Sequence, residues 1–219
     1  MSVAKDNILQ RLRAAKSKPS TEVSSNWQPP HFEKEERLIQ FKKSLIMAHA
    51  EVIETTEENW AQELIKIATS KHLTQWLYSP VTEHGLAFKR EIDNQNNNIK
   101  LTPYDQTVET FKDQLFNKIE ASFTEVQAGI ADTGTLVILP NKSEPRLMSL
   151  VPPVHVALFR ESTLLSNFPE LIEQEDWAKN GLPSNALLIS GPSKTADIQQ
   201  TLAYGAHGPK TLIILIIRS

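Results

Sequence analysis

The sequence predicts an α/β domain with a mostly parallel sheet, helices on both faces and an inserted β-hairpin. Strand-like runs alternate with helical periodicity over residues 33–119 and again over residues 162–217, a pattern typical of parallel sheets covered by helices. Between these stretches, several strand-like segments follow one another with short connections, as hairpins do. The 219 residues, of which 40% are hydrophobic, suffice for the core of one such domain.

The N-terminus predicts a helical arm outside this domain. Residues 4–16 carry Ile8, Leu9 and Leu12 at helical spacing, and residues 17–31 then lose periodicity and contain three prolines. We therefore expect residues 1–31 to form a helix and linker and residues 32–219 to form the main domain. The apolar stripe of the arm could pack on its own domain or on another subunit, so homo-oligomer formation is left open.

The first half of the domain alternates strands and helices. Apolar runs predict strands at residues 52–53, 75–79 and 99–101. Helical spacing predicts helices at residues 33–49, after Thr55, at 83–93 and at 108–119, and the spacing of Thr55 and Glu58 predicts a capping box at the second of these helices.

The second half begins with the hairpins. Strands are predicted at residues 129–132, 135–139, 146–150 and 154–159. The alternation then resumes with a helix at 162–176, a strand at 186–189, a helix at 195–203 and a strand at 211–217.

Composition excludes several classes of chemistry. The chain has no cysteine, which rules out disulfides, thiolate catalysis and cysteine-bound zinc or iron–sulfur clusters within it. A net charge of −3 without a basic stripe gives no electrostatic case for nucleic-acid binding. No apolar run reaches the length of a membrane span and no signal-peptide core is present. We therefore expect a soluble, cytoplasmic protein.

Glycine is scarce, and its positions indicate a candidate site. Six of the seven glycines fall at or after residue 129, where they allow positive φ or a close approach of the backbone. Two loops combine glycine with hydroxyl and charged side chains. Their candidate ligand-binding residues are Thr133, Gly134 and Thr135 in the first loop and Gly191, Ser193, Lys194, Thr195 and Asp197 in the second.

The second loop lies between a predicted strand and a predicted helix. In that setting, backbone N–H groups at a helix start hold anions, and open α/β sheets bind ligands at the carboxyl ends of their strands. The loop lacks the spacing of a Walker A motif. Ordinary helix capping by Ser193 or Thr195, with Asp197 facing the helix dipole, explains the same residues. In the first loop, plain turn chemistry explains Asp132 and Gly134 equally well.

Two histidines are candidates for proton transfer, because imidazole titrates near neutrality. His207 lies between two glycines, and His155 follows two prolines at the start of a predicted strand. Each also has a structural explanation: His207 could stabilise a helix C-terminus, and His155 could be a hydrogen-bonded strand residue. The other four histidines show no metal-ligand spacing, and we expect no metal site.

Three blocks of sequence together resemble the LUD-domain family. They read IADTGTLV at residues 130–137, LVPPVH at residues 150–155, and SGPSKTADI at residues 190–198 followed by GAHGPK at residues 205–210. Their order and spacing are most similar to the lactate-utilisation protein C group. The N-terminal 120 residues agree with that group in layout but carry no diagnostic motif.

The resemblance implies a fold similar to that of sugar-phosphate isomerases and CoA transferases. It also implies a cytoplasmic three-protein system that oxidises L-lactate to pyruvate, in which iron–sulfur clusters belong to the partner proteins. A chain without cysteine suits the component that has no cluster. The resemblance supplies no catalytic residue.

Three functional hypotheses follow. The first is a subunit of this lactate system with a pocket for a small carboxylate or phosphorylated ligand. The second is a stand-alone isomerase- or transferase-like enzyme acting on a sugar phosphate or CoA ester. The third is a structural assembly subunit whose pocket is empty. Ligand binding and turnover by the purified chain distinguish them.

Overall fold

The largest element of the molecule is a parallel sheet. The computed structural model describes residues 3–14, 28–95, 97–196 and 202–218. Six strands form the sheet in the order β1-β12-β7-β4-β2-β3, and each neighbouring pair is parallel, as predicted. These strands are β1 (Glu51–Thr56), β2 (Gln75–Tyr78), β3 (Lys100–Pro103), β4 (Ala121–Glu125), β7 (Val154–Arg160) and β12 (Thr211–Arg218).

A smaller sheet lies beside it. Its order is β8-β5-β6-β9, with β5 and β6 forming the antiparallel hairpin that the sequence predicts. The strands are β5 (Ala128–Ile130), β6 (Thr135–Ile138), β8 (Leu164–Leu165) and β9 (Leu187–Ile189). A further antiparallel pair consists of β10 (Lys194–Ala196) and β11 (Leu202–Tyr204).

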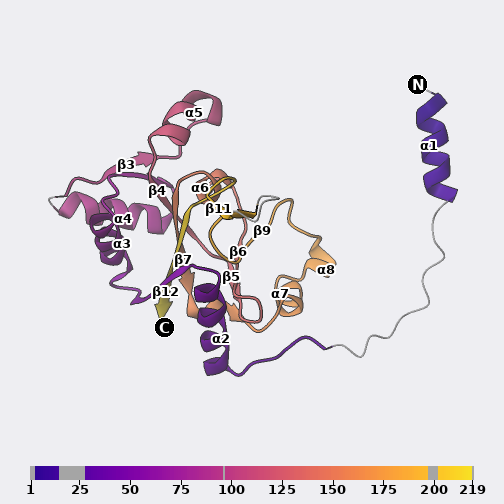
Figure 1. Ribbon diagram of the computed structural model, residues 1–219, viewed down its shortest axis with the longest axis horizontal. Coiled ribbons are helices and arrows are strands. Elements are labelled where there is room, and N and C mark those ends of the chain that lie inside the picture. The colour runs from indigo at the N-terminus through magenta and orange to yellow at the C-terminus, as the bar shows by residue number, and fades with distance from the viewer. Residues whose placement is uncertain (1–2, 15–27, 96, 197–201, 219) are drawn as a thin grey trace.

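Helices cover both faces of the large sheet (Figure 1). On one face lie α3 (Trp60–Ser70) and α4 (Glu83–Asn94). On the other lie α2 (Lys34–Met47), the smaller sheet, α5 (Val108–Asn117) and the single turn α6 (Leu147–Leu150). The remaining helices are α1 (Val3–Ala14), α7 (Phe168–Gln174), α8 (Trp177–Asn180) and a 3₁₀ turn at Glu161–Thr163.

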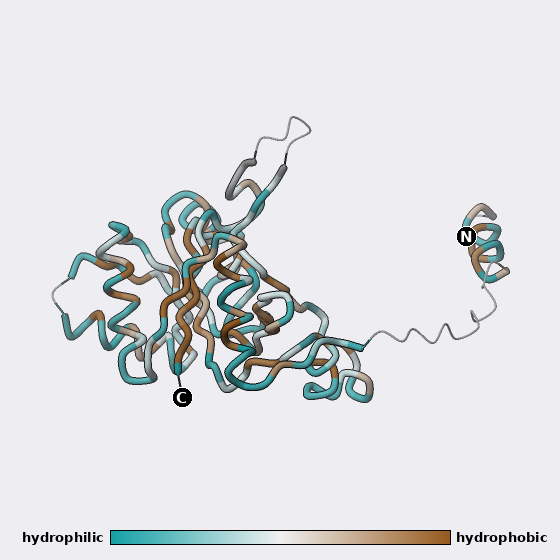
Figure 2. The backbone as a smooth tube through the Cα atoms, turned by 60° about the horizontal axis from the view of Figure 1, so that its bottom comes forward, coloured by the Kyte–Doolittle hydropathy of each residue, from teal (hydrophilic) through white to brown (hydrophobic). Residues whose placement is uncertain are grey.

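The alternation of side chains along β12 explains why the sheet sits between these layers. Ile213, Leu215 and Ile217 pack in the cluster with α3 and α4. Leu212 and the two even-numbered isoleucines of β12 pack in the cluster with α2 and the smaller sheet. A strand buried on both faces needs such a continuous apolar run, and Figure 2 shows this hydrophobic stretch at the centre of the molecule.

Most predicted elements of the first half are confirmed, with two differences. The helix after Thr55 begins at Trp60, and its N-cap is Asn59, whose side chain makes no capping bond, so the predicted capping box is wrong. Strand β4 was not predicted because Ser122 and Thr124 interrupt its apolar pattern. Both are buried with partners: Ser122 donates to the Met148 carbonyl, and Thr124 contacts His155.

Three predictions for the second half are wrong. The strand predicted at residues 146–150 is replaced by helix α6 at residues 147–150, because a turn that starts at Pro145 places Met148 against the core. The helix predicted at 162–176 begins only at Phe168, the first residue of α7, and Asn167 caps it. Pro169 lies in its first turn, where proline is common. The helix predicted at 195–203 is also wrong, because its described residues belong to β10 and β11.

The strand at 186–189 exists as β9, but it pairs antiparallel with β6 and lies in the smaller sheet. The glycine loop that follows is therefore not at the carboxyl edge of a parallel strand. It also does not open a helix, so an anion site of the helix-dipole kind is absent from its described residues.

Candidate functional site

Two hollows lie at opposite ends of the parallel sheet. The first, which we name the amino-edge cavity, has a volume of about 250 Å³ and lies where β7 and β12 begin. The described residues lining it are Ser149, Leu150, His155, Leu188, Ile189, Ser190, Gly191, Pro192, Ser193, His207, Gly208, Pro209 and Leu212. Its wall therefore includes both candidate histidines and part of the second glycine loop.

His155 forms the buried end of this cavity. It is the second residue of β7, is 0% exposed and lies 2.9 Å through Nε2 from the hydroxyl of Thr124. Its Nδ1 has no hydrogen-bond partner among the residues that the structure describes. Burial lowers the pKa of His155 to about 3, so the ring is neutral near pH 7. His155 thus lies in the cavity wall as a neutral ring with one buried nitrogen that has no partner among the described residues.

Backbone hydrogen bonds join the loops that carry Ser193 and His207. The Ser193 N–H donates to the Pro209 carbonyl at 2.8 Å, and the Gly205 N–H donates to the Ser193 carbonyl at 3.0 Å. A Cβ on Gly208 would lie 3.2 Å from that of Ser193, so glycine allows this close approach. His207 is exposed at the cavity wall.

The first glycine loop lies behind this wall. The hydroxyl of Thr135 is 2.7 Å from that of Thr133 and 2.7 Å from that of Ser190, which lines the cavity. Gly134 has a φ of 61°, and a Cβ there would come within 2.5 Å of Ser44 on α2. Turn geometry and helix packing therefore require glycine here, and the two threonines reach the cavity only through Ser190.

The remaining candidates of the second loop lie elsewhere. Lys194 is exposed and Thr195 is half-buried on β10, and neither is among the described residues that line the cavity. Gly191 lines the cavity, and its close neighbour on the other side is Ala48 after α2. Asp197 lies outside the described residues.

The second hollow, which we name the carboxyl-edge cleft, has a volume of about 470 Å³. It lies where β1, β4 and β7 end and α4 begins, at the edge where open α/β sheets usually bind ligands. The described residues lining it are Glu57, Trp60, Thr82, Glu83, His84, Ala87, Arg90, Glu125 and Arg160.

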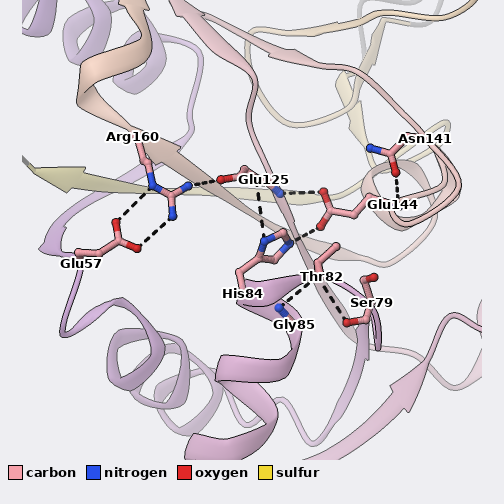
Figure 3. A network of polar contacts seen from close by, with 9 residues as sticks. All are labelled: Glu57, Ser79, Thr82, His84, Gly85, Glu125, Asn141, Glu144 and Arg160. Carbon is pink, nitrogen blue, oxygen red and sulfur yellow. Dashed lines mark hydrogen bonds and ion pairs between the residues drawn. The ribbon is translucent and has the colours of Figure 1, made fainter.

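An arginine connects two glutamates across this cleft (Figure 3). Arg160, the last residue of β7, donates from Nε and Nη2 to the two carboxylate oxygens of Glu57, at 3.2 and 3.0 Å. Its Nη1 donates to Glu125 at the end of β4. Partial burial works to lower the pKa of Arg160, but these carboxylates outweigh it and raise the pKa.

A histidine and a glutamate form a buried pair beside this network. His84 Nε2 lies 2.6 Å from a carboxylate oxygen of Glu144, and the two side chains are only 11% and 9% exposed. The other Glu144 oxygen accepts the Glu125 N–H at 3.2 Å. His84 Nδ1 lies 4.0 Å from Glu125 Oε2, which is beyond hydrogen-bond distance (Figure 3).

Sequence reasoning missed the carboxyl-edge cleft. His84 is one of the four histidines without metal-ligand spacing, and neither Glu125 nor Glu144 belongs to a motif. One signal was available: Glu57, Glu125 and Arg160 each lie at or directly after the end of a parallel strand. Charged residues in that position converge on one edge of a sheet.

Among the described residues, no group of three or more histidine, aspartate or glutamate side chains is arranged to hold a metal ion. None of the helices in this part of the chain combines the length and apolar character needed to cross a membrane.

Comparison with known proteins identifies the family. The LUD domain model matches residues 38–217. An uncharacterized protein of Neisseria meningitidis serogroup B is 39% identical, over 98% of this chain and 93% of that protein. Lactate utilization protein C 1 of Bacillus mycoides is 26% identical, over 93% of this chain and 88% of its own length. Lactate utilization protein C of a Geobacillus species is 23% identical, over 85% of this chain and 80% of its own length.

A solved structure supports the fold. The crystal structure of a DUF162 family protein from Deinococcus radiodurans superposes with a TM-score of 0.59 at 15% sequence identity. The match covers 85% of this chain and 99% of that one. At this identity the likeness shows a shared fold and nothing about activity.

Proposed function

The chain belongs to the LUD-domain family, and we propose that it serves in lactate utilisation by binding a small carboxylate in the amino-edge cavity. Support for the process comes from the Bacillus mycoides and Geobacillus relatives, which are named lactate utilization protein C. Support for the ligand comes from the cavity itself, whose volume of about 250 Å³ suits a molecule of a few heavy atoms.

One observation carries the assignment of the site. His155 Nδ1 is buried and unpartnered among the described residues, although a buried polar atom without a partner costs roughly 1–3 kcal/mol. If the Thr124 hydroxyl donates to Nε2, the neutral ring carries its proton on Nδ1, and this donor has no acceptor among the described residues. A carboxylate oxygen is the acceptor that this donor lacks, and the hydroxyls of Ser190 and Ser193 offer further donors.

The electrons of lactate oxidation need another carrier. This chain has no cysteine, so it cannot hold an iron–sulfur cluster through thiolates. We therefore propose that iron–sulfur partner proteins accept the electrons and that this chain binds and orients the carboxylate.

Calorimetric titration of the purified protein with L-lactate and with pyruvate tests the site. We expect binding that His155→Leu weakens at least about tenfold, because the leucine removes a hydrogen bond to a charged group. His72→Asn, at an exposed histidine with a φ of 55°, is the matched control and should bind like the wild type. Unchanged binding in His155→Leu would remove the cavity from the proposal.

Growth tests the process. A strain of the source organism without this chain should fail to grow on L-lactate, and the wild-type gene should restore growth. Co-purification from the native host should recover iron–sulfur proteins with the tagged chain. Normal growth of the deletion strain on L-lactate contradicts the role, and turnover of a sugar phosphate or CoA ester by the isolated chain supports the stand-alone enzyme.

A further inference from the structure

The carboxyl-edge cleft contains a histidine whose two ring nitrogens have different surroundings. Nε2 of His84 faces the carboxylate of Glu144 at 2.6 Å, and because a carboxylate only accepts, the proton lies on Nε2 in the neutral ring. Nδ1 is then an acceptor. It has no hydrogen bond within the described residues and faces the cleft beside Glu125.

The surrounding chain holds this arrangement in place. Asn141 Oδ1 accepts the Glu144 N–H at 2.9 Å, and the Asn141 N–H donates to the Glu144 carbonyl at 3.1 Å, which fixes the loop that delivers the carboxylate (Figure 3). On α4, Thr82 caps the first turn by accepting the Gly85 N–H. His84 is therefore positioned from both sides.

With the His84 ring in its neutral form, two acceptors lie beside each other in the cleft. His84 Nδ1 and Glu125 Oε2 are 4.0 Å apart, which leaves room for one donor group at hydrogen-bond distance from both. A hydroxyl has one proton and satisfies one of them. An ammonium group has three N–H donors and a positive charge, so it satisfies both and compensates the Glu125 carboxylate.

The opposite charge is available on the same helix. Arg90 lines the cleft on the face of α4 that also presents Glu83 and Ala87, at spacings of seven and three residues. It is exposed and makes no ion pair with any described residue. A guanidinium in that position binds a carboxylate, with a bidentate geometry available to it.

The overall charge also favours a ligand with a cationic end. The lining contains Glu57, Glu83 and Glu125 against Arg90 and Arg160, so it carries a net charge of −1 before His84 is counted. This net charge does not favour a simple anion. A zwitterion with its ammonium at Glu125 and its carboxylate at Arg90 matches the sign at each end.

We propose that the carboxyl-edge cleft is a binding site for a free α-amino acid, with the ammonium at His84 Nδ1 and Glu125 and the carboxylate at Arg90. The volume of about 470 Å³ leaves space for a side chain along Trp60. This site is separate from the amino-edge cavity and does not depend on the function proposed for that cavity.

L-Alanine and L-lactate are the matched probes, since they differ only in the ammonium and hydroxyl groups. The full-length protein is titrated calorimetrically with each of the standard amino acids, with L-lactate, and with propionate, which has neither group. We expect at least one amino acid to bind and L-alanine to bind at this site in preference to L-lactate. Arg90→Ala and His84→Asn should each lower the affinity for the amino acid about tenfold. Lys89→Ala, at the adjacent residue that pairs with Asp93 outside the cleft, should bind like the wild type.

A structural effect of His84→Asn is separated from a binding effect in two ways. Arg90→Ala removes an exposed side chain and keeps the fold, so it tests the site alone. Imidazole ¹⁵N chemical shifts of His84 should move on addition of the bound amino acid in wild-type protein and in His155→Leu alike. The proposal is overturned if no amino acid binds, if L-lactate shifts His84 as L-alanine does, or if binding survives both substitutions.

Discussion

The two ends of the parallel sheet place histidines in opposite electrostatic environments. At the amino edge, His155 is completely buried with a threonine hydroxyl as its partner, and burial lowers its pKa to about 3. At the carboxyl edge, His84 touches the carboxylate of Glu144 and lies in a network of charged side chains. The amino-edge cavity therefore suits a small ligand bound by neutral donors, while the carboxyl-edge cleft suits a ligand that carries charges of its own.

The largest expected difference concerns Glu144. Glu144→Ala removes the partner of His84 and leaves the Glu125 N–H without its acceptor. Leaving these two donors without an acceptor should lower the free energy of unfolding by about 3 kcal/mol. Urea unfolding measures this loss, and carboxylate binding in the amino-edge cavity should be unchanged because that cavity lies at the other end of the sheet.

Glu57→Ala is the matched control for that substitution. The Glu57 side chain is 55% exposed and pairs with Arg160, which keeps Glu125 as a second partner. An exposed pair contributes roughly 0–1 kcal/mol. Equal losses of stability in the two variants would show that the His84–Glu144 contact contributes no more to the free energy of unfolding than an exposed ion pair.

Sequence and structure agree best at the loops and the strand end around the amino-edge cavity. His155, Gly191, Ser193 and His207 were all candidates, and the structure places them around one cavity. Glycine and proline mark such loops in a single sequence, because few other residues allow their backbone conformations. The parallel sheet was predictable for a similar reason, since β12 contains the continuous apolar run expected of a strand that is buried on both faces.

The carboxyl-edge cleft could not be predicted in the same way. Glu144 and His84 are 60 residues apart in the chain, and their contact depends on where α4 and the loop before α6 pack. The helix predicted at residues 195–203 failed for a related reason. Local spacing suggested a helix, but backbone pairing between β10 and β11 decided the structure.

A pair of glycine substitutions compares how tightly the backbone is packed at the two edges of the sheet. A Cβ on Gly85 would lie 1.9 Å from the Ser79 carbonyl oxygen, so Gly85→Ala must displace α4 and His84 with it. Overpacking of this kind should cost about 2 kcal/mol even though alanine favours the helix by about 1 kcal/mol. At the amino edge, the Cβ of Gly208→Ala would meet the Ser193 side chain at 3.2 Å and the Leu150 carbonyl oxygen at 3.9 Å, so it would need a smaller adjustment. Thermal melts should therefore rank Gly85→Ala well below Gly208→Ala, and the reverse order contradicts this view of the cleft.

The pH dependence of stability distinguishes the two histidines. The pKa of His155 is about 3 in the folded protein and 6.5 when unperturbed, so the unfolded chain binds one more proton between these values. Stability therefore falls as the pH drops below about 6.5, and the contribution lost between pH 7.5 and pH 5.5 is on the order of 1 kcal/mol. His155→Gln lacks this titration, so its unfolding free energy should fall less over the same interval. Urea titrations of both proteins at the two pH values give the difference, and parallel falls would show that His155 is accessible to protons in the folded state.

The smallest expected effect is that of Lys194→Ala, which tests the assignment of the glycine loop. The sequence places Lys194 among the ligand-binding candidates, whereas in the structure it is exposed on β10 and outside the described lining of the amino-edge cavity. Substitution of such a surface residue should change stability by less than about 0.5 kcal/mol, and carboxylate affinity should stay within about twofold. Ser193→Ala, one residue earlier and on the cavity wall, should weaken binding more because it removes a hydroxyl donor. Calorimetry on the two variants decides between the positions: a tenfold loss in Lys194→Ala would mean that the ligand draws β10 toward the cavity and that the lysine contacts its carboxylate directly.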